Sequence, residues 1–316
     1  MKSRSASACI KEGYGLYTAK FRKTIAASWH FALLYAIACS AICTIATTYI
    51  PKVMTQTLEA APIANAMPKG IIAMICTFCV LAIVGGVLEV ATYSCGLSQL
   101  KSGFATAAPP RKWWKPTLHK PMFVRCLIAA LCCLLIGVVL AAVFFGVTYL
   151  AIHFAAGGSI SQTAATITIS AELAVMALIM MPLGFIAIKY VFRTDTHFWK
   201  LLAADYPTAL KHYGFMLIVM LVSCIVIVVA EYILALPAML LATASYQANI
   251  GVLQGDPLGM PGYITYVSAV VFFMAGFMQA YIRMSALFTA YYMYGSIETQ
   301  EEERKLYKAA GKQENL

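Results

Sequence analysis

The chain has 316 residues, of which 61% are hydrophobic and only 11% are charged. A soluble domain usually carries roughly 25% charged residues, so this composition excludes an ordinary soluble globular protein. The net charge is +10, but the basic residues lie in short segments between long apolar runs. That placement argues against nucleic-acid binding and indicates a membrane protein.

Six apolar runs are long enough to cross a membrane, because a helix needs about 20 apolar residues to span a hydrocarbon core of roughly 30 Å. The predicted spans are Trp29–Ile50, Gly70–Leu97, Met122–Phe154, Ser170–Phe192, Gly214–Leu241 and Ile264–Tyr294. We therefore expect an all-α fold, a polytopic transmembrane bundle of six helices arranged as three hairpins. A basic leader over residues 1–28 would precede the transmembrane domain at 29–294, and a charged tail would occupy 295–316.

The distribution of Lys and Arg predicts the orientation. Of the 23 basic residues, 20 lie in the leader, in the second and fourth connecting segments with their edges, and in the tail. The other three are Lys52 and Lys69 in the first loop and Arg283 inside the last span. By the positive-inside rule the leader and the tail are both cytoplasmic. We expect a bacterial inner-membrane protein with its N- and C-termini in the cytoplasm.

Two inner segments, Lys11–Lys23 and His197–Lys211, mix aromatic, aliphatic and basic residues. Such segments are typical of short helices that lie along the membrane surface with their apolar side down. The alternative is an ordinary helix packed on the bundle. We expect short interfacial helices on the cytoplasmic side.

Each returning helix carries one charged residue 19 positions after the start of its predicted span, and these residues are Glu89, Lys189 and Arg283. The match suggests three related hairpins. Internal repeats are common in membrane transporters, although they also occur in membrane proteins that transport nothing.

The chain has a basic aromatic leader from Phe21 to Trp29, three predicted hairpins, and an exit that runs from Tyr291–Gly295 to Glu298. In this arrangement it resembles the bacterial six-helix membrane domains found alone or fused to some glycerophosphodiesterases. The resemblance covers the architecture of most of the chain and contains no specific motif. It implies a membrane domain without catalytic residues of its own, so no site residue follows from it.

Ionisable residues inside a span are costly, and each is a functional hypothesis. Glu89 and Arg283 fall at the same predicted depth, so an ion pair between them would lower the cost of both charges. Such a pair would either hold two helices together or line a pathway, and the third alternative is that the two residues never meet. Glu231 has no basic residue in its own span. It is either neutral or paired with another helix, and a proton-coupled role is the functional alternative.

Span four carries two further charges and a predicted kink. Glu172 is expected to reach water at the outer edge, and Lys189 to extend its ammonium group to the inner interface. Pro182 with Gly184 interrupts the span and predicts a kink. Interrupted helices often mark transporter sites, but proline also occurs in ordinary membrane helices.

The sequence names no reaction. Cys76 and Cys79 have a redox-like spacing, but the predicted outer loops contain no second thiol pair, and the five histidines show no metal-ligand spacing. We expect no metal and no cofactor. The leading hypothesis is the handling of a lipid or small solute within the bundle. The alternative is a structural or assembly subunit that binds other membrane proteins or its own copies, and a membrane enzyme comes third. A polar cavity reached by Glu89, Glu231 or Arg283 would favour transport, and an apolar groove would favour partner binding.

Overall fold

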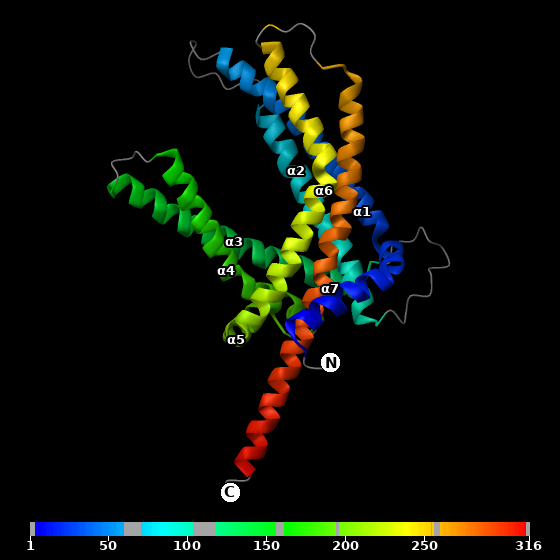
Figure 1. Ribbon diagram of the computed structural model, residues 1–316, viewed down its shortest axis with the longest axis vertical. Helices are drawn as coiled ribbons and strands as arrows, with labels where there is room; N and C mark the ends of the chain where they lie inside the picture. The colour runs from blue at the N-terminus through cyan, green and yellow to red at the C-terminus, as the bar shows by residue number, and fades with distance from the viewer. Residues whose placement is uncertain are drawn as a thin grey trace. The chain divides into compact units, whose positions relative to one another are not determined.

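The computed structural model describes residues 4–59, 71–103, 118–155, 161–193, 196–253, 255 and 260–313. These residues form seven helices and no strand. The helices are α1 (Ala6–Glu59), α2 (Ile71–Lys101), α3 (Lys120–Ala155), α4 (Gln162–Phe192), α5 (Phe198–Lys211), α6 (Tyr213–Leu253) and α7 (Tyr263–Gln313) (Figure 1).

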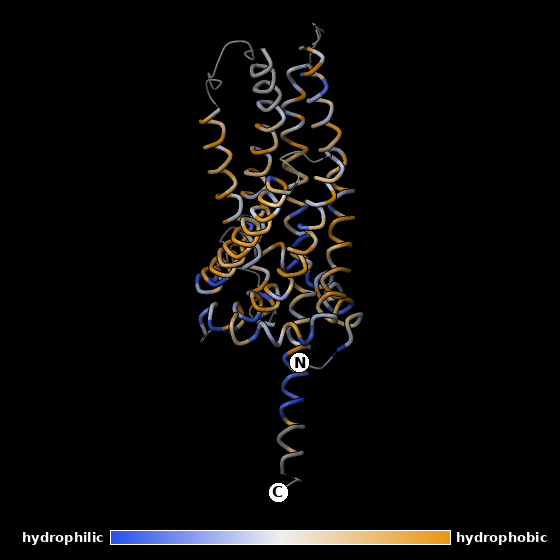
Figure 2. Tube along the Cα trace, turned by 90° about the vertical axis from the view of Figure 1, so that its left-hand side faces the viewer, coloured by the Kyte–Doolittle hydropathy of each residue, from blue (hydrophilic) through white to orange (hydrophobic). Residues whose placement is uncertain are grey.

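Every described helix except α5 is long and apolar enough to cross a membrane, which gives six such helices. In a hydrocarbon environment a helix satisfies its backbone hydrogen bonds internally, and this is why long apolar runs adopt that form. Figure 2 shows apolar residues along most of the helical length and hydrophilic residues near the end of α7. The predicted all-α fold with six membrane-length helices is confirmed, whereas the grouping into three hairpins stays a prediction.

Two helices extend well beyond their predicted spans. Helix α1 includes Lys11–Lys23, so this segment is not a separate helix. The sequence has no proline between Ala6 and Tyr49 that would end the helix there. Helix α7 likewise continues to Gln313, so residues 294 and 295, where the charged tail was expected to begin, lie within one helix.

The chain forms two compact units. Unit 1 consists of Met1–Ala19, Lys120–Ser223 and Ala286–Leu316, and contains α3, α4 and α5. Unit 2 consists of Lys20–His119 and Cys224–Ser285, and contains α2. Helices α1, α6 and α7 contribute residues to both units.

Within unit 1, α4 packs against both α3 and α5, and Figure 1 shows α3 and α4 side by side. Arg125 of α3 joins α3 to the end of α4. Its Nε and Nη2 donate to the Tyr190 carbonyl at 3.0 and 2.8 Å, and Nη2 also donates to the Arg193 carbonyl. The last carbonyls of a helix have no partner within the helix, so Arg125 satisfies groups that would otherwise be left open.

Within unit 2, small residues bring α1 and α7 close together. A Cβ atom at Gly276 of α7 would lie 3.1 Å from the Cβ of Cys39 and 3.4 Å from the Cα of Ala36. One helical turn away from Ala36, the Ser40 hydroxyl donates to the Ala269 carbonyl at 2.6 Å. Small residues and serine hydroxyls at a helix interface are typical of packing between membrane helices.

Candidate functional site

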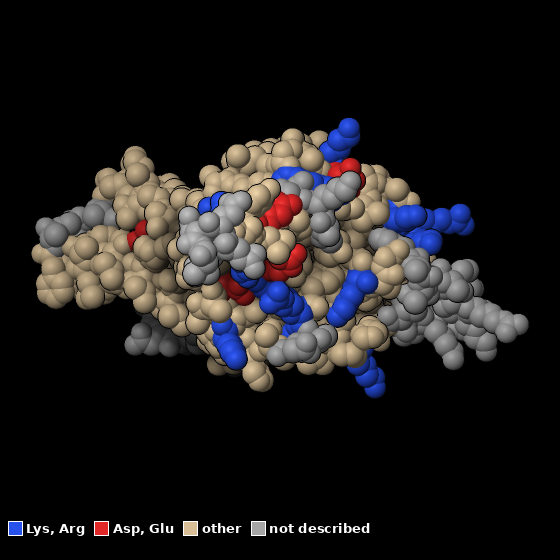
Figure 3. Space-filling model, turned by 90° about the horizontal axis from the view of Figure 1, so that it is seen from below, with Lys and Arg blue, Asp and Glu red and all other residues tan. Residues whose placement is uncertain are grey.

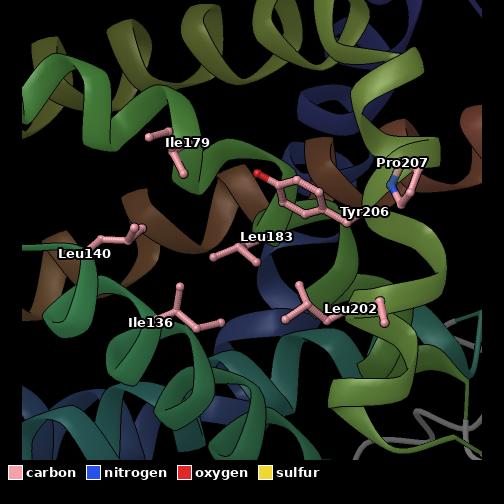
Figure 4. A pocket seen from close by; sticks show the side chains of 8 residues that line it. Ile136, Leu140, Ile179, Leu183, Leu202, Tyr206 and Pro207 are labelled. Carbon is pink, nitrogen blue, oxygen red and sulfur yellow. The ribbon is translucent and has the colours of Figure 1, made fainter. Parts of the chain in front are cut away.

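An apolar pocket lies between α3, α4 and α5 in unit 1 and has a volume of about 450 Å³. The lining residues are hydrocarbon apart from the hydroxyl of Tyr206. They are Ile136 and Leu140 of α3, Ile179 and Leu183 of α4, and Leu202, Ala203, Tyr206 and Pro207 of α5. Figure 4 shows these side chains around a common space, with the Tyr206 ring extending from α5 toward α4. The pocket therefore fits a hydrocarbon group better than a polar solute.

Helix α5 has faces of different character, because residues three or four apart lie on the same side of a helix. Phe198, Leu201 and Ala209 are buried and form its packing face. Trp199 and Leu210 are 54% and 49% exposed and lie on the side of Leu202 and Tyr206, which line the pocket. The existence of a helix within His197–Lys211 is confirmed, and its place along a membrane surface stays a prediction.

Ion pairs centred on Lys189 position α5. The Nζ atom of Lys189 lies 2.8 Å from Asp205 of α5 and 2.5 Å from Glu298 of α7, and Arg193 lies 3.1 Å from the same Glu298. Lys189 is only 5% exposed. Two acidic partners from other helices neutralise its ammonium inside unit 1, and its place at the inner interface stays a prediction.

A second group of ion pairs lies at the junction of α5 and α6. His212, the single residue between these helices, is 7% exposed, and its Nε2 lies 2.9 Å from Glu301 of α7. Arg304 lies 3.3 Å from the same carboxylate. Near the middle of the face drawn in Figure 3, acidic side chains lie beside Lys and Arg side chains. These contacts hold the α5–α6 junction against α7 within unit 1.

The proline and glycine of α4 mark a tightly packed region. Helix α4 continues through Pro182, which is fully buried. A Cβ atom at Gly184 would lie 2.6 Å from the terminal methyl of Met220 on α6. Gly184 therefore lies where α6 approaches α4 closely, next to the pocket residue Leu183.

Glu172 lies inside unit 1, contrary to the expectation that it would reach water. It is 9% exposed and accepts a hydrogen bond from the Thr148 hydroxyl of α3, while its Oε2 is buried with no hydrogen-bond partner. The physical reason is that α4 begins at Gln162, eight residues before the predicted span start at Ser170. Glu172 thus falls in the third turn of the helix, where it faces α3.

The structure brings three of the intramembrane charges together in unit 2. Arg283 of α7 places Nε 2.6 Å from Glu231 of α6 and Nη1 3.3 Å from Glu89 of α2. The hydroxyl of Tyr35 on α1 lies 3.5 Å from the same Nη1. Tyr93 donates to Glu89 at 2.5 Å. Groups from α1, α2, α6 and α7 therefore meet at one guanidinium.

This cluster sets two carboxyl groups against one guanidinium, and no other Lys or Arg of the described residues forms a salt bridge with either carboxyl group. The Arg283 side chain is 38% exposed. The cluster fits the sequence-based expectation in bringing Glu89 to Arg283, and it adds Glu231 as the closer partner. None of these three residues lines the pocket of unit 1.

The cysteines of the described residues are free, and Cys76 and Cys79 are both exposed on α2. Among the residues that the structure describes, no three His, Cys, Asp or Glu side chains are grouped so that they could hold a metal ion. No protein-family model matches the chain, and neither a curated protein nor a solved structure is found to be similar to it.

Sequence reasoning missed the pocket. Its lining residues on α3 and α4 are aliphatic side chains within long apolar runs, and they do not differ from the lipid-facing residues around them. On α5, in contrast, apolar residues recur at helical spacing on two sides of the helix, and this pattern indicates a second apolar face beside the packing face.

Proposed function

We propose that the chain is a multi-pass membrane protein that binds a membrane lipid, with one acyl chain in the pocket between α3, α4 and α5. The observation that carries this proposal is the hydrocarbon lining of the pocket. Ligand pockets in proteins typically have volumes of roughly 300–1,000 Å³, and this one falls within that range. A polar solute would find only the Tyr206 hydroxyl as a hydrogen-bonding side-chain group, so its desolvation would be poorly compensated.

The proposal includes a location. The chain is a bacterial inner-membrane protein with both termini in the cytoplasm, and α5 lies at the cytoplasmic surface. The basic residues of the inner segments and the exposed Trp199 of α5 support this placement. A lipid that enters from the inner leaflet would then meet α5 first. The resemblance to six-helix membrane domains without catalytic residues agrees with a role in lipid binding rather than catalysis.

A second candidate function is that of a structural or assembly subunit. The end of α7 supports it, because Leu306 and Tyr307 are 71% and 80% exposed and follow the run of charged residues near the end of the helix (Figure 2). Two neighbouring exposed apolar side chains on a polar helix form a contact point for another protein. The apolar pocket of unit 1 also supports this second function, because an apolar side chain of a partner helix fits a hydrocarbon lining as an acyl chain does.

Lipid binding is tested by a substitution that fills the pocket with a large side chain from an exposed position of α5. Ala203 lines the pocket and Ala204 does not, although both are exposed on α5. We expect Ala203→Trp to remove the lipid that native mass spectrometry detects on the purified protein, and Ala204→Trp to retain it. Because neither alanine belongs to the packed core, both variants should fold, which the elution profile in detergent checks. Equal lipid occupancy in the two variants, or no bound lipid on the unmodified protein, would overturn the proposal.

A further inference from the structure

We infer that the lipid held by this pocket is an anionic glycerophospholipid, whose phosphate lies between Lys200 and Lys211 of α5. This inference rests on the proposed function, because it names the headgroup that accompanies the acyl chain.

The two lysines lie on the helix face that borders the pocket. Lys200, Ala203, Pro207 and Lys211 are separated by three, four and four positions, and such positions share one face of an α-helix. Ala203 and Pro207 line the pocket. The lysines therefore stand one turn before and one turn after the stretch of α5 that opens to the pocket.

The charges of both lysines remain available. Lys200 and Lys211 are exposed, and neither forms a salt bridge with a carboxylate in the described part of the chain. Among the residues that the structure describes, three acidic groups near α5 already have closer cationic partners. Asp205 is bound by Lys189, and Glu298 is bound by Lys189 and Arg193. Glu301 is within electrostatic reach of Lys211 but is bound by His212 and Arg304.

The position of Asp205 leaves the lysine face of α5 without a negative charge from this helix. Lys189 holds Asp205, the only acidic residue of α5, from α4, so its carboxylate is turned away from the lysine face. The face beside the pocket is consequently positive, with no acidic residue of α5 on it. A headgroup whose net charge is negative complements this face. The ammonium group of a zwitterionic headgroup would be repelled by it.

The spacing suits one headgroup between two cations. The lysines are eleven positions apart on the helix, which is about 16 Å along the axis at ~1.5 Å per residue. A phosphate above Ala203 and Pro207 is then about 8 Å along the axis from each, within roughly one Debye length at physiological salt. From that position one acyl chain reaches the pocket, while Trp199 and Leu210 contact the neighbouring lipid.

The experiment compares two lipids that differ only in the headgroup. Phosphatidylglycerol and phosphatidylcholine with identical acyl chains are titrated onto the purified full chain, and bound lipid is counted by native mass spectrometry. The variants are Lys200→Gln/Lys211→Gln, Ala203→Trp, and the control Lys11→Gln/Arg22→Gln, which removes the same charge from exposed positions of α1.

We expect the unmodified protein to prefer phosphatidylglycerol by about tenfold, since each surface lysine contributes on the order of 1 kcal/mol toward an anionic lipid and tenfold corresponds to 1.4 kcal/mol. The double lysine variant should bind both lipids alike, and the control should keep the preference. Equal binding of the two lipids by the unmodified protein would overturn the inference, and so would an equal loss of the preference for phosphatidylglycerol in the control. In either case, loss of both lipids in Ala203→Trp would still support lipid binding in the pocket. Unchanged binding in Ala203→Trp would instead show that the proposed function itself has failed.

Discussion

Arg283 is bound more closely by Glu231 than by Glu89. Its Nε lies 2.6 Å from one Glu231 oxygen and its Nη2 3.5 Å from the other, whereas Glu89 is reached by Nη1 alone at 3.3 Å. A two-point contact between guanidinium and carboxylate is the stronger geometry. Tyr93 also donates to Glu89, so Glu89 keeps a hydrogen bond without Arg283. The electrostatic attraction of Arg283 in unit 2 therefore acts mainly between α6 and α7.

Charge reversals test whether Arg283 interacts more strongly with Glu231 than with Glu89. The pair Glu231→Arg with Arg283→Glu should recover more of the stability lost in its single variants than the pair Glu89→Arg with Arg283→Glu. Breaking a buried pair costs roughly 3–5 kcal/mol. We expect about 2 kcal/mol for each single reversal, because Arg283 is partly exposed. Unfolding in a denaturing detergent, analysed as two double-mutant cycles, gives both coupling energies. A larger coupling for Glu89 with Arg283 would contradict the structure.

The contact of Gly13 with Thr289 gives a second prediction, in unit 1. A Cβ atom at Gly13 would lie 2.6 Å from the Cα of Thr289 and 2.9 Å from its backbone nitrogen. Backbone atoms cannot rotate away, so Gly13→Ala should force α1 and α7 apart locally and cost roughly 1–3 kcal/mol, as overpacking does.

Gly15→Ala is the matched control, because nothing lies within 4 Å of a Cβ atom there. Alanine is the better helix former by about 1 kcal/mol, so this variant should be as stable as the unmodified protein or slightly more so. Thermal unfolding in detergent measures both variants. Equal melting temperatures for the two variants would count against the close approach of α1 to α7.

Lys189 gives a third prediction. Lys189→Met should free α5, because it leaves Asp205 without its cation and leaves Glu298 with Arg193 only. The loss should be about 3 kcal/mol for a buried pair. Backbone hydrogen exchange should rise over Phe198–Lys211. The comparison is Lys11→Met, which removes an exposed lysine from α1 and should leave exchange over α5 unchanged. Equal exchange in both variants would show that the Lys189 contacts do not hold α5.

The sequence predicts the helical architecture well because apolar run length is a local property. It also suggests that Glu89 and Arg283 meet, since equal distance from the start of each span places them at equal depth. It does not identify Glu231 as the closer partner of Arg283, because the rotation of α6 about its axis depends on packing with sequence-distant helices. For a similar reason the sequence does not show that Lys189 is buried between two acidic partners, because Glu298 lies more than 100 residues away in sequence.

Contact between a lipid chain and the pocket can be measured directly by photocrosslinking. A phosphatidylglycerol with a diazirine in its acyl chain is bound to the purified protein and irradiated, and the labelled peptides are identified by mass spectrometry. We predict that labelling concentrates on the pocket residues Ile136, Ile179 and Tyr206, exceeds that of exposed apolar residues such as Val228 and Ile233 of α6, and is lost in Ala203→Trp. Uniform labelling of all exposed apolar residues that Ala203→Trp does not change would contradict the proposal that this protein holds a lipid between α3, α4 and α5.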